Sequence, residues 1–201
     1  TVIPTDSAAL DIWDEFWEAE RNAHILAADR IHELSNWLLL TGNRFLAFYA
    51  STLDGECTVR NIVPEQIAEI VTNPEDGSEP WFYKRQWNDG KSQRVLYYPD
   101  WQLFFSDKLE EAWEKLQSSG RVPSNAERAD IRDQGELQQA STVVCVLHMA
   151  FNHKEDDSLW GWPLLTTARP WLRAHREFME ARLTVAAAKA ITTVMFGATL
   201  G

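Results

Sequence analysis

Few side chains in this sequence have the spacing that a chemical site requires. Cys145, His148 and His153 are spaced like half of a zinc site, and zinc needs about four ligands at ~2.0–2.3 Å. On a strand, Cys145 and His148 point to opposite faces because their separation is odd. Nothing in the sequence places the other thiol, Cys57, nearby. We interpret Cys145 as a core residue and both histidines as surface residues, and we expect no structural metal and no disulfide.

Other catalytic motifs are incomplete or absent. His32-Glu33 begins like the HExxH zinc motif, but Asn36 stands where the second histidine is required. The sequence has no G-x-x-x-x-G-K-[ST] phosphate-binding loop and no G-x-S-x-G nucleophile elbow. Nothing singles out a Ser, a His and an Asp that would form a triad. We therefore expect a protein without catalytic activity and without a cofactor.

An acidic group near the N-terminus offers an alternative of an enzymatic kind. Carboxylate oxygens are ligands for divalent ions, and a metal-dependent nuclease would need several of them at one point. The expected helix puts only Asp11 with Glu15, or Asp14 with Glu18, on a shared face. A solvated acidic face is the better interpretation, and the nuclease is kept as an alternative.

Composition argues against a free nucleic-acid-binding module. The 201 residues carry a formal net charge of -11, whereas such modules usually show a basic patch and a basic balance. Acidity repels nucleic acid from most of the surface, which still permits a passage through which DNA slides. Ten Trp residues indicate large aromatic contacts in the core or at interfaces. No apolar run approaches the ~20 residues of a membrane span, and no signal peptide is visible.

The longest element expected from the sequence is a helix that follows Trp160. Pro163 fits its first turn and Gly197 fits the position just past its end. Pro170 predicts a kink or a restart within the first turns. Apolar residues recur at helical spacing, and the uninterrupted part would extend ~40 Å. A helix of this length favours a bundle, a coiled coil or an oligomer.

Six residues of this helix form the candidate subunit contact. They are Trp171, Arg173, Arg176, Glu177, Phe178 and Glu180. The two Arg–Glu pairs among them are each four residues apart, so their side chains can meet on the helix surface. Arg and aromatic residues are enriched where proteins meet. We expect these residues to lie on or near a contact with a neighbouring subunit.

The remaining pattern predicts an α+β fold in four segments. Residues 1–40 form an N-terminal helix, 41–105 a β-rich region, 106–141 a helix capped by Ser106 with a polar loop insertion, and 142–201 a strand, a turn and the long helix. The strands expected are Arg44–Thr52, Cys57–Val63, Trp81–Trp87, Gln93–Tyr98 and Thr142–Met149. Asp54-Gly55 and Asn88-Asp89-Gly90 predict hairpin turns, so we expect the first four strands to form one antiparallel sheet.

Two stretches of the sequence resemble the portal proteins of tailed phages, the head-to-tail connectors. The first is Asn36–Phe45 followed by Val59–Ile67, a small-residue turn, an apolar strand, a hairpin and a "P-x-x-I/V" step, and it continues through Trp81–Tyr98. The second is Val143–Met149 followed by Leu159–Leu165. There, His148 and Gly161-Trp162-Pro163-Leu164 occupy the places of the family's "V-x-H" and "G-x-(P/S)-L" patterns before a long helix.

The resemblance implies an architecture and a set of partners. It implies an N-terminal helix, an antiparallel wing-like part and a stem-like helix in a homo-oligomeric ring, usually of twelve subunits, at one capsid vertex. It implies a channel through which double-stranded DNA passes without sequence-specific binding, beside the capsid protein, the large terminase and the tail or adaptor proteins. It also implies a virion protein that is assembled in the host cytoplasm and performs no catalysis.

The resemblance has one departure and leaves one alternative. Portal proteins continue through further stem, clip and crown segments, whereas this sequence stops at Gly201, so those parts are missing, truncated or unseen. The alternative is another oligomeric virion or scaffold protein that uses the same long helix as its seam.

Overall fold

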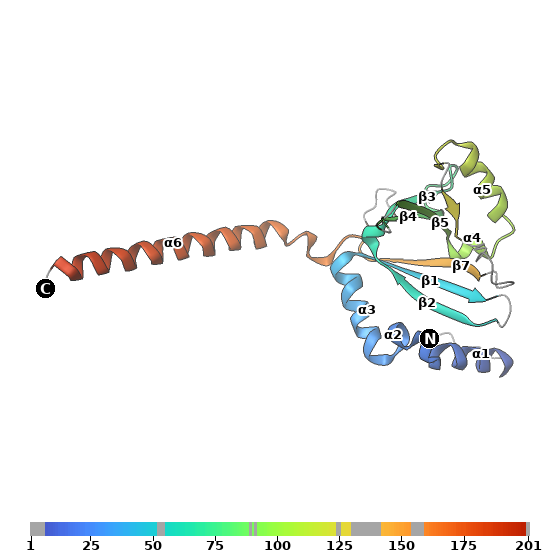
Figure 1. Cartoon of the computed structure of the whole chain (residues 1–201), viewed down its shortest axis with the longest axis horizontal. Coiled ribbons are helices and arrows are strands. Elements are labelled where there is room, and N and C mark those ends of the chain that lie inside the picture. Colours follow the sequence, from blue (N-terminus) through green and yellow to red (C-terminus); the bar gives the residue numbers. More distant parts are fainter. Residues whose placement is uncertain are drawn as a thin grey trace. The chain divides into compact units, whose positions relative to one another are not determined.

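The computed structural model describes most of the chain (Figure 1). It covers residues 7–51, 55–88, 90, 92–123, 126–129, 142–153 and 159–199, with side chains described from residue 9 to residue 190 of these, Thr142 excepted. The expected turns at Asp54-Gly55 and Asn88-Asp89-Gly90, and the second half of the polar insertion, lie partly outside these residues. Both helices and antiparallel sheets are present, with a long C-terminal helix, which confirms the α+β class.

The N-terminal region forms three helices, so the prediction of one continuous helix is wrong. They are α1 (Ser7–Glu18), α2 (Glu20–Leu26) and α3 (Ala28–Thr41). The chain leaves helical geometry at Ala19 and Ala27, whose ψ angles are 124° and 145°. These two bends let Phe16, Ile25 and Leu34 pack against the same sheet face, which a straight rod would touch over only part of its length.

The strands form two sheets, and the prediction of a single sheet is wrong. They are β1 (Asn43–Ser51), β2 (Cys57–Ile62), β3 (Ile67–Thr72), β4 (Pro80–Asn88), β5 (Gln93–Pro99), β6 (Glu127–Arg128) and β7 (Thr142–Ala150). The first sheet has the order β2-β1-β7 and the second β3-β4-β5-β6. A short turn, η1 (Pro64–Gln66), carries the chain from one sheet to the other. All pairs are antiparallel except the short pair β5–β6.

The two sheets face each other across the main hydrophobic core. Phe45, Ala47 and Val146 of the first sheet pack with Tyr83 and Leu96 of the second. A parallel bridge between Asp100 and Val146 joins the sheets at one edge. The alternation expected for a buried strand is confirmed in β1, where Phe45 and Ala47 face this core while Leu46 faces helices α1–α3 on the other side.

Two further helices cover the outer face of the second sheet. They are α4 (Trp101–Phe104) and α5 (Leu109–Ser118). Leu103, Ala112 and Leu116 bury themselves there against the sheet residues Phe82 and Tyr97. Ser106 does not cap α5, because its hydroxyl donates to Leu103 O at 2.7 Å and the helix begins three residues later. Asp100 instead caps α4, accepting a hydrogen bond from Gln102 N at 2.8 Å.

The last helix belongs to a separate compact unit. Residues 1–164 form the first unit and residues 165–201 the second. The helix proper, α6 (Arg169–Thr199), follows a short turn η2 (Leu164–Thr166), so it begins at Arg169, one residue before Pro170, rather than at Pro163. The predicted restart at Pro170 is confirmed, whereas Gly197 lies inside the helix and does not end it. Among the described residues, no helix has both the length and the apolar character that crossing a membrane requires.

Candidate functional site

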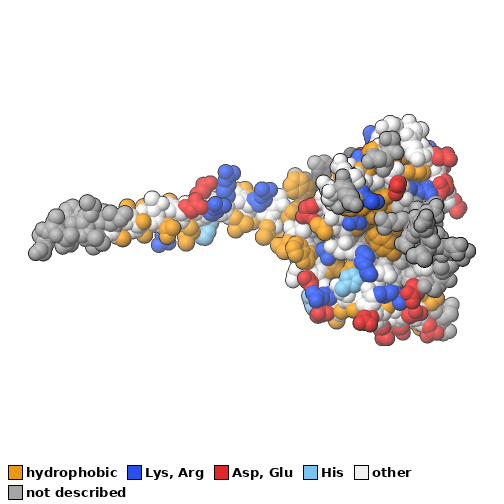
Figure 2. Space-filling view, viewed as in Figure 1, with side chains coloured by type: hydrophobic (Ala, Val, Ile, Leu, Met, Phe, Trp, Pro, Cys, Tyr) orange, Lys and Arg blue, Asp and Glu red, His pale blue; other side chains and the backbone are white. Residues whose placement is uncertain are grey.

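Helix α6 presents nearly all of its described side chains to solvent. Its 31 residues would extend about 46 Å at the usual rise per residue. Trp171 is 79% exposed and Phe178 is 58% exposed, and other large apolar side chains of the helix are also open to water. Figure 2 shows hydrophobic and charged side chains side by side along this helix. An exposed row of large apolar groups is typical of a surface that is covered by a partner.

The six candidate contact residues all lie on α6, and the expected ion pairs form. Arg173 Nε lies 3.4 Å from Glu177 Oε1, and Arg176 Nε lies 2.9 Å from Glu180 Oε1. All four side chains are exposed, so within one chain each pair adds only a few tenths of a kcal/mol. That these residues touch a neighbouring subunit stays a prediction.

The candidates divide between two faces of the helix. Trp171 and Phe178 are seven residues apart, so at ~100° per residue they return to the same side after two turns. The four charged residues lie between about 140° and 240° around the axis from Trp171, which is the opposite side. Arg182 belongs to the aromatic side, where its guanidinium lies 5.7 Å from the centre of the Phe178 ring. Helix α6 therefore has an aromatic face and an ionic face.

A buried hydrogen-bonded junction anchors the segment that leads toward α6. Asn43 is only 6% exposed, and its Nδ2 donates to Gly161 O at 2.9 Å while its Oδ1 accepts from Gly161 N at 2.7 Å. The Phe151 N–H donates to Gly42 O at 2.8 Å, and Trp162 N–H donates to Phe151 O at 2.8 Å. The α3–β1 turn, the end of β7 and the loop before η2 are thereby held together.

Neither glycine of this junction can carry a side chain. A Cβ at Gly161 would meet Gly42 O at 2.0 Å and the Phe151 N at 2.6 Å. Gly42 adopts φ 80°, a left-handed conformation that side chains disfavour, and a Cβ there would meet Trp162 C at 2.6 Å. The backbones of the two loops therefore approach too closely for any residue except glycine.

His148 completes the junction, and its interpretation as a surface residue is wrong. Its ring stacks on Phe45 with centroids 4.3 Å apart, and its Nε2 lies 3.1 Å from Asn43 Oδ1. Because that oxygen is an acceptor, the contact is a hydrogen bond only when Nε2 carries the proton. Burial lowers the pKa of His148 to about 4, so the ring is neutral near pH 7. Four residues cited for the portal resemblance, Gly42, Asn43, His148 and Gly161, thus meet at one point.

The cysteine and histidine trio does not converge. Cys145 is buried on the outer face of the first sheet, while His148 lies on the inner face, as their odd separation predicts. His153 is exposed, as expected. Cys57 and Cys145 are free thiols that line one apolar groove from strands β2 and β7, with β1 between them. Burial raises the pKa of both, that of Cys145 to about 11, so both are poor nucleophiles at neutral pH.

The acids required by the nuclease alternative are spread along an exposed helix face. Asp11, Asp14, Glu15 and Glu18 are all exposed on α1. Glu15 Oε1 lies 3.9 Å from Arg21 Nη2, so an arginine of the same chain already balances the charge of this carboxylate. Over the described ranges, no three His, Cys, Asp or Glu side chains come together in a group that could hold a metal ion.

Two buried polar residues were not identified from the sequence. Asn22 is completely buried, donates to Phe16 O and Cys57 O, and accepts from Val59 N at 3.0 Å. Asp100 accepts a 2.7 Å hydrogen bond from Tyr83 Oη, and burial raises the pKa of its carboxyl. Their positions on helical and loop segments carry no signal that distinguishes them from surface residues. Both tie neighbouring elements together by hydrogen bonds.

Comparison with other proteins does not identify a relative. No protein-family model, curated protein or solved structure matches this chain.

Proposed function

We propose that this chain is a subunit of the portal ring of a tailed phage, a structural protein without catalytic activity. The observation that carries the proposal is the exposure of α6, a 31-residue helix with large apolar side chains open to solvent. In this role the ring surrounds the passage for double-stranded DNA at a capsid vertex and binds the large terminase, the capsid protein and the tail or adaptor proteins.

The two faces of α6 suit a ring better than a two-fold dimer. A ring subunit meets two neighbours through different surfaces, whereas a dimer uses one surface twice. An aromatic face and an ionic face on opposite sides of one helix offer two unlike surfaces. The acidic balance of the chain, -11, agrees with a channel along which DNA slides without being held.

The junction at Asn43 provides a second, independent support. The resemblance to portal proteins rests on short patterns that are far apart in the sequence. Their residues Asn43, His148 and Gly161 are joined by hydrogen bonds over separations of 105 and 118 residues. Patterns that matched by chance would have no reason to meet in the fold.

Charge reversal on α6 tests the proposal. Arg176→Glu replaces the ion pair with Glu180 by a repulsion worth only ~0.5 kcal/mol within a single helix. Across a desolvated subunit contact the cost reaches several kcal/mol, and it recurs at every subunit. We therefore expect the variant to keep its circular dichroism spectrum while large assemblies disappear from light scattering and native mass spectra.

A companion variant and a control complete the experiment. Phe178→Asp places a charge on the aromatic face and is expected to abolish assembly in the same way. Arg121→Glu makes the same charge change at an exposed site in the first unit and should leave assembly size unaltered. Wild-type assemblies that persist in both α6 variants would contradict the ring. A small closed oligomer in place of a large ring would favour the virion or scaffold alternative.

A further inference from the structure

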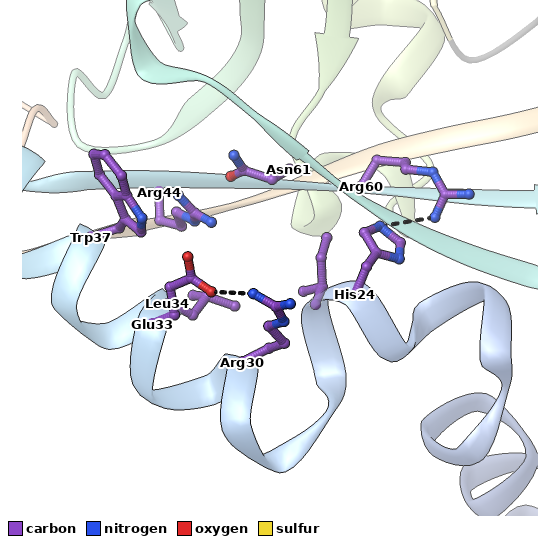
Figure 3. A pocket seen from close by; sticks show the side chains of 9 residues that line it. His24, Arg30, Glu33, Leu34, Trp37, Arg44, Arg60 and Asn61 are labelled. Atoms are coloured by element: carbon purple, nitrogen blue, oxygen red, sulfur yellow. Dashed lines mark hydrogen bonds and ion pairs between the residues drawn. The ribbon is translucent and has the colours of Figure 1, made fainter.

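A hollow of about 340 Å³ lies within the first unit between helices α2 and α3 and strands β1 and β2. Figure 3 shows Arg30, Glu33 and Trp37 along α3, facing Arg44 and Asn61 of the sheet. The lining residues are His24, Ile25, Arg30, Glu33, Leu34, Trp37, Arg44, Arg60 and Asn61. Three guanidinium groups therefore surround a space that contains a single carboxylate.

Arg44 has no partner among the described residues. Its Nε is buried without a hydrogen bond, and its guanidinium forms no ion pair within 4.0 Å with a described residue. Desolvation lowers its pKa, which reflects a cation held where water is partly excluded. Partial burial of a guanidinium without a direct anionic partner costs free energy. An anion bound beside Arg44 would therefore gain a favourable interaction that the free protein does not make.

The other charged groups that line the hollow do not neutralise Arg44. Arg60 uses Nη1 to donate to neutral acceptors, Arg21 O at 3.0 Å and Val59 O at 2.8 Å, and it approaches His24 Nε2 at 3.2 Å. Glu33 pairs directly with Arg30, whose Nη1 lies 2.7 Å from its Oε2, and its charge also attracts Arg44, but this attraction is weaker than the desolvation of the Arg44 guanidinium. The hollow thus keeps an excess of positive charge in a chain whose net charge is -11.

A second polar group in the hollow also lacks a partner. Asn61 Oδ1 is buried without a hydrogen bond. A half-turn of the side-chain amide exchanges its oxygen and nitrogen, so the same position can present an N–H donor. Leu34 and Trp37, which is 48% exposed, form an apolar wall beside these groups. Water can satisfy a hydrogen bond here, but it cannot neutralise the guanidinium.

We propose that this hollow binds a compact oxyanion, a phosphate or a carboxylate, held by Arg44 with the Asn61 amide and bordered by Arg30 and Arg60. The planar, forked guanidinium matches two oxygens of either group. The anion completes the pairing that Arg44 lacks. The inference concerns the first unit alone and does not depend on ring formation.

Titration with two probes tests the site in the whole chain. Inorganic phosphate and acetate are added separately at constant ionic strength maintained with chloride. Thermal unfolding and NMR signals of the Arg44 Nε–H, the Asn61 amide and the Trp37 indole report binding. We expect saturable shifts confined to these groups, and Arg44→Gln should weaken binding by about tenfold or more. Arg121→Gln removes the same charge at an exposed site outside the hollow and should leave binding unchanged.

The outcomes separate the two sources of the anion. A response to phosphate alone assigns the site to phosphates, and a response to acetate alone assigns it to carboxylates. Arg44→Lys keeps the positive charge without the forked guanidinium, so it should bind the anion more weakly than wild type. Because the charge is kept, this variant also tests the proposal if Arg44→Gln fails to fold. Equal responses in wild type and the Arg44 variants, or shifts spread over the whole protein, would overturn the proposal.

Discussion

Asn43 illustrates how a single buried amide determines the path of the chain. Both ends of its side chain bond to the backbone of Gly161, and its oxygen also meets His148 Nε2. Replacing it would leave the buried N–H and C=O of Gly161 without these partners, and each unsatisfied group costs about 1–3 kcal/mol. The polar group thus specifies one arrangement of loops that hydrophobic burial alone would not distinguish.

The neutral state of His148 predicts a dependence of stability on pH. Its pKa falls from 6.5 to about 4 on folding, so between these values the unfolded chain binds a proton that the folded chain does not. Stability is therefore complete above pH 6.5 and declines as pH falls, by up to ~1.4 kcal/mol per unit and on the order of 3 kcal/mol in total. Urea unfolding at a series of pH values measures this loss.

His148→Gln is the matched control for this titration. Its amide nitrogen can still donate to Asn43 Oδ1, but it does not titrate. The raised pKa of Asp100 acts in the opposite direction, favouring the folded state as pH falls, and it contributes equally to both proteins. The difference between the two pH profiles should contain the His148 contribution. Superimposable profiles would show that the ring is not desolvated.

At the scale of elements, the turn between α3 and β1 and the loop before η2 meet backbone to backbone. Gly161→Ala would place a methyl group against Gly42 O, and we expect it to lower the free energy of unfolding by ~2–3 kcal/mol. At Gly77 an added Cβ meets nothing within 4 Å, so Gly77→Ala should change stability by less than ~0.5 kcal/mol. Chemical denaturation of the two variants makes the comparison. Equal stability would mean that the loops separate easily.

Local patterns predict the strands well but not their assignment to sheets. The alternation in β1 and the Gly-containing turns identify β1, β2, β4 and β5 within one or two residues. Strand β1, however, also pairs along its full length with β7, about a hundred residues later. That pairing, and the turn at Pro64 that moves the chain to the second sheet, depend on contacts distant in sequence.

The breaks in the N-terminal helices have no local signal either. Ala19 and Ala27 end helical geometry although Ala has the strongest helix propensity. The bends are favoured by tertiary contacts, among them the three hydrogen bonds of Asn22 to α1 and β2. The two ion pairs on α6 could be predicted because their residues are four apart in one helix, whereas the junction and the hollow assemble residues from separate elements.

At the scale of the whole molecule, the hydrophobic clusters and the long helix belong to different units. The three buried clusters found among the described residues are all built from residues of the first unit. We expect a chain shortened to residues 1–164 to unfold cooperatively with an unchanged urea midpoint, because it retains every one of these clusters. Light scattering on the same sample should show that it no longer assembles. A shifted midpoint would mean that α6 stabilises the first unit.

The division at Leu164 also separates charge. Residues 165–201 contain five Lys or Arg and two Asp or Glu, a formal +3, which leaves -14 for residues 1–164 of the total of -11. The first unit is therefore strongly acidic and the second unit weakly basic. Two copies that bring like units together repel, whereas the basic unit of one copy is attracted to the acidic unit of another. In the proposed ring, this attraction would favour head-to-tail contacts between neighbouring copies, and added salt should weaken that part of the contact energy.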